Sequence, residues 1–207
     1  MNYSKLFSEL KLGSLTLKNR IVMAPMTRAR AAHNIPNEMM LQYYSLRADS
    51  GLIITESTSP SPNGLGYARM PGNFDPEQSK GWARITKAVH AKQGHIFLQL
   101  MHTGRVSHPL NMSTNAKIMA PSAIKLKGEM WTDEKQMQPY PVPNAMTKQE
   151  IKETIREYAE SAQLAMKAGF DGIELHGANG YLIDQFLNPA SNKRQDEYGG
   201  SSENRMR

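Results

Sequence analysis

Short apolar runs alternate with longer helical patterns along the chain. Four of these runs are continuous and are bounded by turn residues or proline, which is typical of strands. They are residues 20–26, 52–57, 95–101 and 172–175. Continuous apolar strands separated by helices are typical of a buried parallel sheet covered by helices. We therefore expect four adjacent parallel strands whose C-terminal ends lie on one face.

Helical periodicity fills the segment between the first two strands. Pro36 can open a helix there, and Gly51 ends the segment. Met39, Tyr43 and Leu46 follow an i, i+4, i+7 spacing, so we expect them to share one apolar face.

Two further helices have clear start signals. Asp75 can cap a helix that has Pro76 at its first position, and Thr147 with Glu150 forms a capping box. The apolar positions at helical spacing are Trp82, Ile85 and Val89 in the first, and Ile151, Ile155, Tyr158, Ala162 and Ala165 in the second.

Two segments do not fit the alternation. Residues 10–12 and 15–17 alternate apolar and polar positions across Gly13-Ser14, which predicts a small hairpin. Residues 102–146 form a long excursion rich in proline and methionine, and loops of this length are usually functional lids or disordered.

The order of elements fits either an open doubly wound sheet or a (β/α)8 barrel. An open Rossmann sheet should carry G-x-G-x-x-G after its first strand, but Pro25-Met26-Thr27-Arg28 stands there. The sequence thus favours an α/β fold of the (β/α)8 TIM-barrel type. A full barrel needs roughly 250 residues. We therefore expect 1–207 to be a single domain, truncated at its C-terminus in a helix opened by Ser201 or Ser202. It would hold the hairpin and about the first four βα units.

Composition restricts the function classes. Hydrophobic residues make up 39% and charged residues 21% of the 207, which is ordinary for a globular protein. The net charge of +6 is spread along the chain, so nucleic acid is not expected as a partner. Cysteine is absent, and His95, His102 and His108 lack a ligand spacing, so no metal is expected. With no signal peptide or membrane span in the sequence, we expect a cytoplasmic protein without a membrane partner.

The candidate chemistry lies in residues 171–182, where the last strand runs into a glycine-punctuated loop. That loop carries His176, Asn179 and Tyr181. Two neutral hydrogen-bond donors and a phenol beyond a strand end suit an enzyme that polarises a carbonyl and delivers a proton. Active sites of α/β barrels lie at this end of the strands.

Five motifs occur in order at strand ends. They are residues 23–28 (MAPMTR), 55–57 (TES), 98–105 (LQLMHTGR), 176–187 (HGANGYLIDQFL) and 198–205 (YGGSSENR). Together they resemble the Old Yellow Enzyme family over the whole chain, with bacterial N-ethylmaleimide reductase-type alkene reductases as the nearest likeness. The resemblance implies a (β/α)8 barrel with an N-terminal hairpin, and non-covalent FMN.

The resemblance also assigns the cofactor side. Pro25 and Met26 would contact the flavin through their backbone, and Thr27 would place its hydroxyl at the flavin O4. The Ser57 backbone would meet the ring, and Gln99 would hydrogen-bond its pyrimidine edge.

On the catalytic side, the resemblance implies that His176 and Asn179 bind the substrate oxygen and that Tyr181 protonates the α-carbon. NADPH, or NADH, would be the reductant, and the substrate would be a small electrophilic alkene: an α,β-unsaturated carbonyl, maleimide or nitro compound. Met101 stands where many relatives carry tryptophan, which should reshape the substrate pocket.

An alternative from another class is a non-catalytic half-barrel fragment that needs a second half to bind flavin. Four strands of an eight-stranded barrel leave two unpaired edges. On this interpretation, isolated 1–207 binds FMN weakly or not at all, and self-associates through its open edges or is marginally stable.

Overall fold

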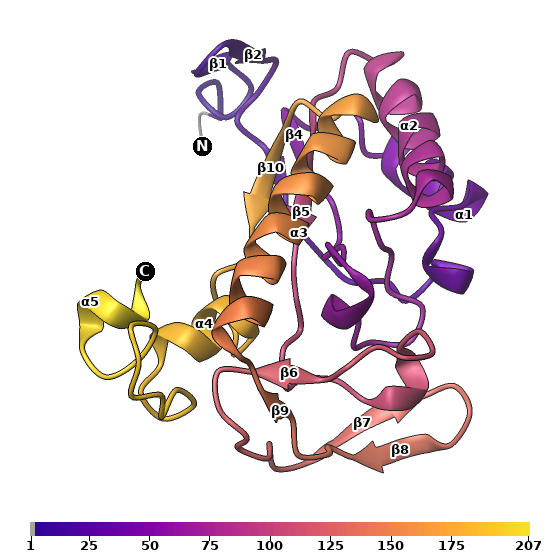
Figure 1. Cartoon of the computed structure of the whole chain (residues 1–207). Coiled ribbons are helices and arrows are strands. Elements are labelled where there is room, and N and C mark those ends of the chain that lie inside the picture. Colours follow the sequence, from indigo (N-terminus) through magenta and orange to yellow (C-terminus); the bar gives the residue numbers. More distant parts are fainter. Residues whose placement is uncertain (1–2) are drawn as a thin grey trace.

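The computed structural model describes residues 3–207 and has a four-stranded parallel sheet as its centre (Figure 1). The strands lie in the order β10-β5-β4-β3, and every neighbouring pair is parallel. Their bounds are β3 (Val22–Met23), β4 (Leu52–Ile54), β5 (Ile96–Leu100) and β10 (Gly172–Leu175). The predicted set of four adjacent parallel strands is confirmed, with their C-terminal ends on one face.

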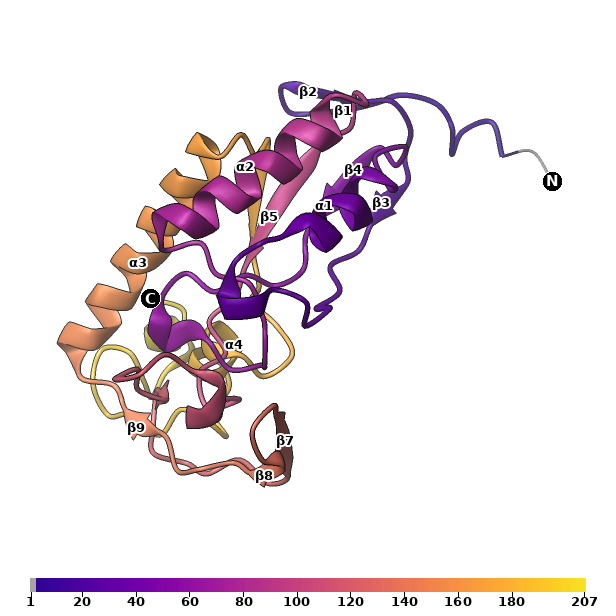
Figure 2. The ribbon, with the colours of Figure 1, turned by 90° about the vertical axis from the view of Figure 1, so that its right-hand side faces the viewer.

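Three helices pack on one another in sequence order and share an apolar core with the sheet (Figure 2). They are α1 (Glu38–Ser45), α2 (Pro76–His90) and α3 (Lys148–Lys167). The predicted cap at Asp75 and the predicted capping box at Thr147 are both present, and Asp75 also forms a capping box with Gln78. Trp82, Ile85 and Val89 are buried against the sheet as predicted. None of the helices within residues 3–207 is long and apolar enough to cross a membrane.

The first helix differs from the prediction in its bounds and its buried face. Asn37 caps it, accepting a hydrogen bond from the backbone N–H of Met40, and it ends at Ser45, well before Gly51. Met39 and Leu46, predicted on one apolar face, are 59% and 74% exposed. Met40 and Tyr44 are buried in their place, because Tyr44 packs against Trp82 and its hydroxyl bonds to Glu56.

The two outer strands are less buried than predicted. Val22 in β3 is 46% exposed and Leu175 in β10 is 54% exposed, whereas Ile53, Ile96 and Leu98 in the central strands are fully buried. Edge strands have a neighbour on one side only, so their apolar side chains lose part of their cover. Three strands are also shorter than predicted: 22–23, 52–54 and 96–100 replace 20–26, 52–57 and 95–101.

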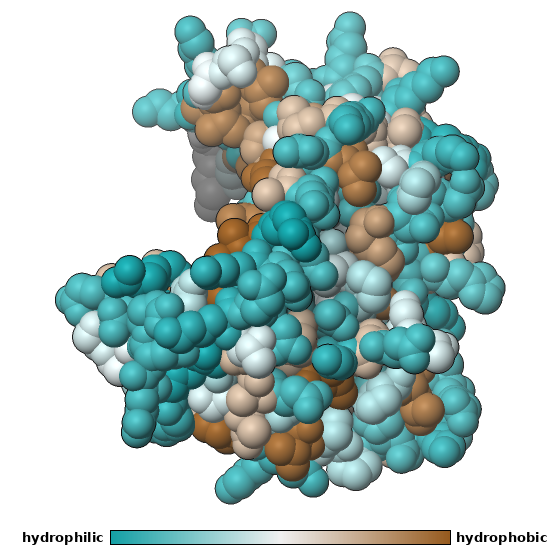
Figure 3. All heavy atoms as spheres, in the orientation of Figure 1, coloured by the Kyte–Doolittle hydropathy of each residue, from teal (hydrophilic) through white to brown (hydrophobic). Residues whose placement is uncertain are grey.

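An apolar pocket of about 380 Å³ adjoins β10. It lies between β10, α3, α4 (Leu182–Leu187) and α5 (Ser202–Arg205). Ile155, one of the apolar positions at helical spacing in α3, is 57% exposed and lines this pocket with Leu175. Figure 3 shows apolar surface at the notch above the α4–α5 segment.

The N-terminal hairpin is confirmed as β1 (Leu10–Leu12) and β2 (Leu15–Leu17), paired antiparallel. The excursion 102–146 is ordered and contains two small sheets. One is the parallel pair β6 (Met119–Ala120) and β9 (Asn144–Ala145), and the other is the hairpin of β7 (Glu129–Thr132) and β8 (Gln136–Pro139).

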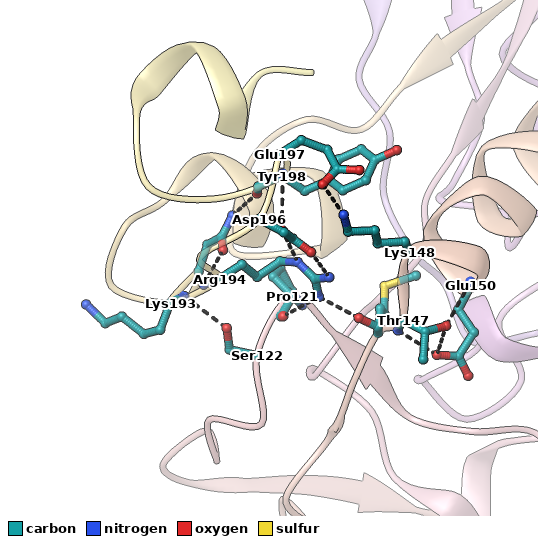
Figure 4. A network of polar contacts seen from close by, with 12 residues as sticks. Pro121, Ser122, Thr147, Lys148, Glu150, Lys193, Arg194, Asp196, Glu197 and Tyr198 are labelled. Atoms are coloured by element: carbon teal, nitrogen blue, oxygen red, sulfur yellow. Dashed lines mark hydrogen bonds and ion pairs between the residues drawn. The ribbon is translucent and has the colours of Figure 1, made fainter.

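Arg194 ties the C-terminal segment to the excursion (Figure 4). Its guanidinium donates to both carboxylate oxygens of Asp196, at 3.0 and 2.6 Å, and to the backbone oxygens of Pro121 and Met146, at 3.0 and 2.5 Å. Lys148 at the start of α3 adds an ion pair with Glu197 at 2.5 Å. The planar, bidentate pairing of Arg194 with Asp196 is one that arginine makes and lysine does not.

Candidate active site

The predicted site residues lie at or beyond the C-terminal ends of the four strands. Gln99 in β5 stands directly opposite Glu174 in β10. Two residues further on, the backbone N–H of His176 donates to the carbonyl of Leu100 at 3.0 Å. Gln99 and His176 are therefore at the same end of the sheet, as the sequence predicted.

Ser57, Gln99 and Glu174 form a hydrogen-bonded chain that runs from the segment after β4 through β5 to β10, here called the strand-end cluster. The Ser57 hydroxyl donates to Oε1 of Gln99 at 2.5 Å, and Nε2 of Gln99 donates to Oε1 of Glu174 at 2.6 Å. Ser57 and Gln99 are only 6% and 4% exposed. The family resemblance pointed to Gln99 in the sequence, but nothing in the sequence pointed to Glu174, because strand pairing had to supply the register.

Glu56, at the end of β4, joins the loop that follows β3 to the sheet. Its carboxylate accepts hydrogen bonds from the backbone N–H of Arg28 and from the Tyr44 hydroxyl, both at 3.1 Å. The Tyr44 hydroxyl in turn accepts from the Glu56 backbone N–H at 2.8 Å. Burial raises the pKa of the Glu56 carboxyl, an effect that these hydrogen bonds oppose.

The segment that Glu56 holds carries the remaining predicted cofactor contacts. Thr27 directly precedes Arg28 and is exposed, Met26 is 49% exposed, and Pro25 is half-buried. Within residues 3–207, no hydrogen bond joins the Thr27 side chain to the strand-end cluster. The structure thus places Thr27 in an exposed position at the same end of the sheet as the strand-end cluster.

Residues 176–181, here called the donor loop, carry the predicted catalytic groups. The rings of His176 and Tyr181 meet edge to face, with their centroids 4.9 Å apart. Nδ1 of His176 accepts from the backbone N–H of Ala178 at 3.3 Å, so the neutral ring carries its proton on Nε2, where it can be donated. Asn179 is exposed and adopts a left-handed backbone with φ of 58°.

Tyr67 is a site residue that sequence reasoning missed. Its hydroxyl lies 2.8 Å from the Tyr181 hydroxyl, and the two rings meet edge to face at 6.3 Å. Burial, followed by the bond to Tyr181, raises the pKa of the Tyr67 phenol. Tyr67 lies in a loop rich in proline and glycine, and only its aromatic character in such a loop could have drawn attention to it.

Met101 lies beneath this tyrosine pair. It is 1% exposed and belongs to an apolar cluster with Leu65 and Met70, against which Tyr67 and Tyr181 pack. Next to it, His102 is fully buried, and burial lowers the pKa of its imidazole to about 3. A neutral His102 accepts from the Gly104 backbone N–H at 3.0 Å and therefore acts as a fixed part of the scaffold.

The parallel sheet, the helices that cover it and the polar side chains at its strand ends can be compared with known proteins. The family model for the NADH:flavin oxidoreductase / NADH oxidase family matches residues 5–207. A probable flavin mononucleotide-dependent alkene reductase of Leishmania infantum is 47% identical over 203 residues, which are 96% of this chain and 56% of that protein. The 12-oxophytodienoate reductase 7 of Oryza sativa subsp. japonica is 41% identical, over 98% of this chain and 52% of its own length.

Solved structures give the same result. The Old Yellow Enzyme homologue of Zymomonas mobilis superposes with a TM-score of 0.93 at 44% identity, covering 97% of this chain and 56% of that one. Morphinone reductase in complex with tetrahydroNAD superposes with a TM-score of 0.91 at 44% identity, covering 97% of this chain and 56% of that one. The chain belongs to the NADH:flavin oxidoreductase / NADH oxidase family, which includes Old Yellow Enzyme. Its structure is part of a (β/α)8 barrel, and it spans about half the length of these relatives.

Proposed function

We propose that this chain provides the cofactor face and the donor loop of an FMN-dependent NAD(P)H oxidoreductase. Its substrates are small alkenes activated by a carbonyl, maleimide or nitro group, and its location is the cytoplasm. The observation that carries the proposal is that the Gln99 amide and the His176–Tyr181 ring pair lie at the same end of the sheet.

The donor set suits FMN. Gln99 keeps one N–H and one lone pair beyond its bonds to Ser57 and Glu174, which suits the alternating donors and acceptors of a flavin pyrimidine edge. Thr27, Pro25 and Met26 would meet the ring from the segment after β3. Bound FMN would supply the hydride transfer between nicotinamide and alkene.

The donor loop would act on the substrate. Nε2–H of His176 and the Asn179 amide would donate to the substrate oxygen and stabilise negative charge developing there. Loss of one such donor typically costs about 3 kcal/mol of transition-state stabilisation. The Tyr181 hydroxyl would give its proton to the α-carbon, since a phenol of pKa about 10 is protonated at neutral pH.

Half-reaction kinetics test these roles. Tyr181→Phe should slow alkene reduction and leave flavin reduction by NADPH unchanged, while His176→Ala should weaken the binding of phenolic or enone ligands. The two half-reactions use different groups, so the effects should separate. Equal slowing of both half-reactions by Tyr181→Phe would remove its role as proton donor.

A second candidate is a non-catalytic half-barrel that self-associates through its edges. The exposed apolar positions of β3 and β10, and the pocket beside β10, favour it. Sedimentation combined with flavin titration separates the two candidates. A cooperatively melting monomer with stoichiometric FMN and a flavin absorbance band would reject this one, and colourless oligomers would support it.

A further inference from the structure

Glu174 has no role in the site as proposed so far, yet it holds the central residue of the cofactor face. Its Oε1 accepts from Nε2 of Gln99 at 2.6 Å, and strand register places the two residues directly opposite each other. Because they are register partners in a parallel pair, their side chains leave the sheet on the same side. The contact is therefore built into the pairing of β5 with β10.

The two partners of Gln99 are of opposite kinds. The Ser57 hydroxyl is a donor at one end of the amide, and the Glu174 carboxylate is an acceptor at the other. Turning the amide by 180° would set its oxygen against a carboxylate oxygen, which repels it. A carboxylate cannot donate when ionised, so Glu174 decides the orientation, whereas a hydroxyl could serve either end.

This orientation decides what the amide presents to a ligand. With Oε1 facing Ser57 and Nε2 facing Glu174, one N–H and one lone pair remain at defined places. Gln99 is 4% exposed, so water does little to offset a wrongly turned amide.

We infer that Glu174 is a positioning residue that fixes the orientation of the Gln99 amide and thereby sets its hydrogen bonding to the pyrimidine edge of FMN. The inference rests on the proposed function for the identity of the ligand. The orientation of the amide itself is a property of the chain without FMN, so it can be tested separately.

The first test uses chain 1–207 without flavin and follows the side-chain amide of Gln99 by ¹H–¹⁵N NMR. The signals of the Gln99 amide are identified as those absent from the spectrum of Gln99→Leu. One of the two protons should exchange slowly and lie downfield, because it is bonded to a carboxylate. Glu174→Ala should remove that signature. Glu174→Gln should weaken it, since its amide can accept the same bond but can also donate, and so no longer forces one orientation. An unchanged Gln99 signal in Glu174→Ala would overturn the inference.

The second test is an FMN titration of the same proteins, followed by flavin fluorescence. Glu174→Ala should weaken affinity about tenfold, the scale of one lost hydrogen bond. Glu174→Gln should weaken it by less, because its amide can still accept the bond in one of two orientations. Glu160→Ala, which removes an exposed carboxylate on α3, is the matched control for charge and should have no effect. Wild-type affinity in Glu174→Ala, or equal loss in both Glu174 variants, would overturn the inference. Failure of the wild-type chain to bind FMN would instead count against the proposed function, and the amide signals would then decide this inference alone.

Discussion

The strand-end cluster and the donor loop lie at the same end of one sheet, but they are held in different ways. Ser57, Gln99 and Glu174 are joined side chain to side chain at 2.5 and 2.6 Å, from the segment after β4 through β5 to β10. The backbone of His176 is bonded to Leu100 of β5, but the side chains of His176 and Tyr181 are held by ring packing, by a bond within the loop, and by one hydroxyl contact with Tyr67, a residue 114 positions away. The sheet orients the side chains of the first group, whereas those of the second depend on contacts within and between loops.

This difference matches the tasks proposed for the two groups. A cofactor that stays bound through many turnovers needs fixed donors, which strands supply. A substrate that enters and leaves needs groups that can adjust, and loops supply these. Substitutions of residues at the strand ends, here called the strand side, should therefore affect stability most. Substitutions in the donor loop should affect ligand binding with little cost in stability.

The largest stability effect is expected from Glu56→Ala. It leaves the buried Tyr44 hydroxyl and the Arg28 backbone N–H without their acceptor. Each unsatisfied buried donor costs about 1–3 kcal/mol, so we expect the free energy of unfolding to fall by about 3 kcal/mol. Urea denaturation measures it, with Glu160→Ala as an exposed control that should change it by less than about 0.5 kcal/mol. A loss of under 1 kcal/mol for Glu56→Ala would show that the strand side is less rigidly held than the geometry implies.

The pH dependence of stability gives a smaller and independent effect at the same residue. Burial raises the pKa of Glu56 in the folded state above its ordinary value of 4.5, which the unfolded chain keeps. At pH values between the unfolded and the folded pKa, the folded state therefore binds more protons than the unfolded state. The contribution of Glu56 is then fully present below pH 4.5 and is lost as the pH rises through the folded pKa. The wild type should therefore lose stability relative to Glu56→Gln as the pH rises from 4.5. Parallel curves for the two proteins would contradict the raised pKa.

Tyr67→Phe tests the donor loop and should cost less. It removes the hydroxyl partner of Tyr181 in a half-buried place, for an expected loss of about 1 kcal/mol in the free energy of unfolding. Tyr140→Phe is the matched control, because burial also raises the pKa of Tyr140 but its hydroxyl makes no hydrogen bond within residues 3–207. Equal losses in the two variants would mean that the Tyr67–Tyr181 contact adds nothing specific.

The strand side was also the more predictable from sequence. The four strands, the helix caps at Asp75 and Thr147, and the placement of Gln99 and His176 at one end all follow from local patterns and parallel pairing. Glu174 and Tyr67 could not be predicted from such local patterns, because each depends on a partner that strand register or loop packing brings close. The face of α1 was predicted wrongly for the same reason: its orientation is set by the bond of Tyr44 to Glu56 and by Trp82, not by its own periodicity.

Asn179→Gly should have the smallest effect on stability and still affect the ligand. Asn179 has φ of 58°, which glycine adopts without steric cost, although glycine loses more entropy on folding. We expect the free energy of unfolding to stay within about 0.5 kcal/mol of the wild type, with weaker binding of a phenolic ligand because the amide donor is gone. Asn179→Ala removes the same donor but keeps a Cβ in a left-handed backbone, so it should lose about 1 kcal/mol more. Denaturation and phenol titration of the pair separate the two roles of this residue. If the glycine variant is destabilised by more than 1 kcal/mol, or binds the phenol as the wild type does, then the Asn179 side chain supports the loop rather than the substrate, and the contrast between the two groups fails at this position.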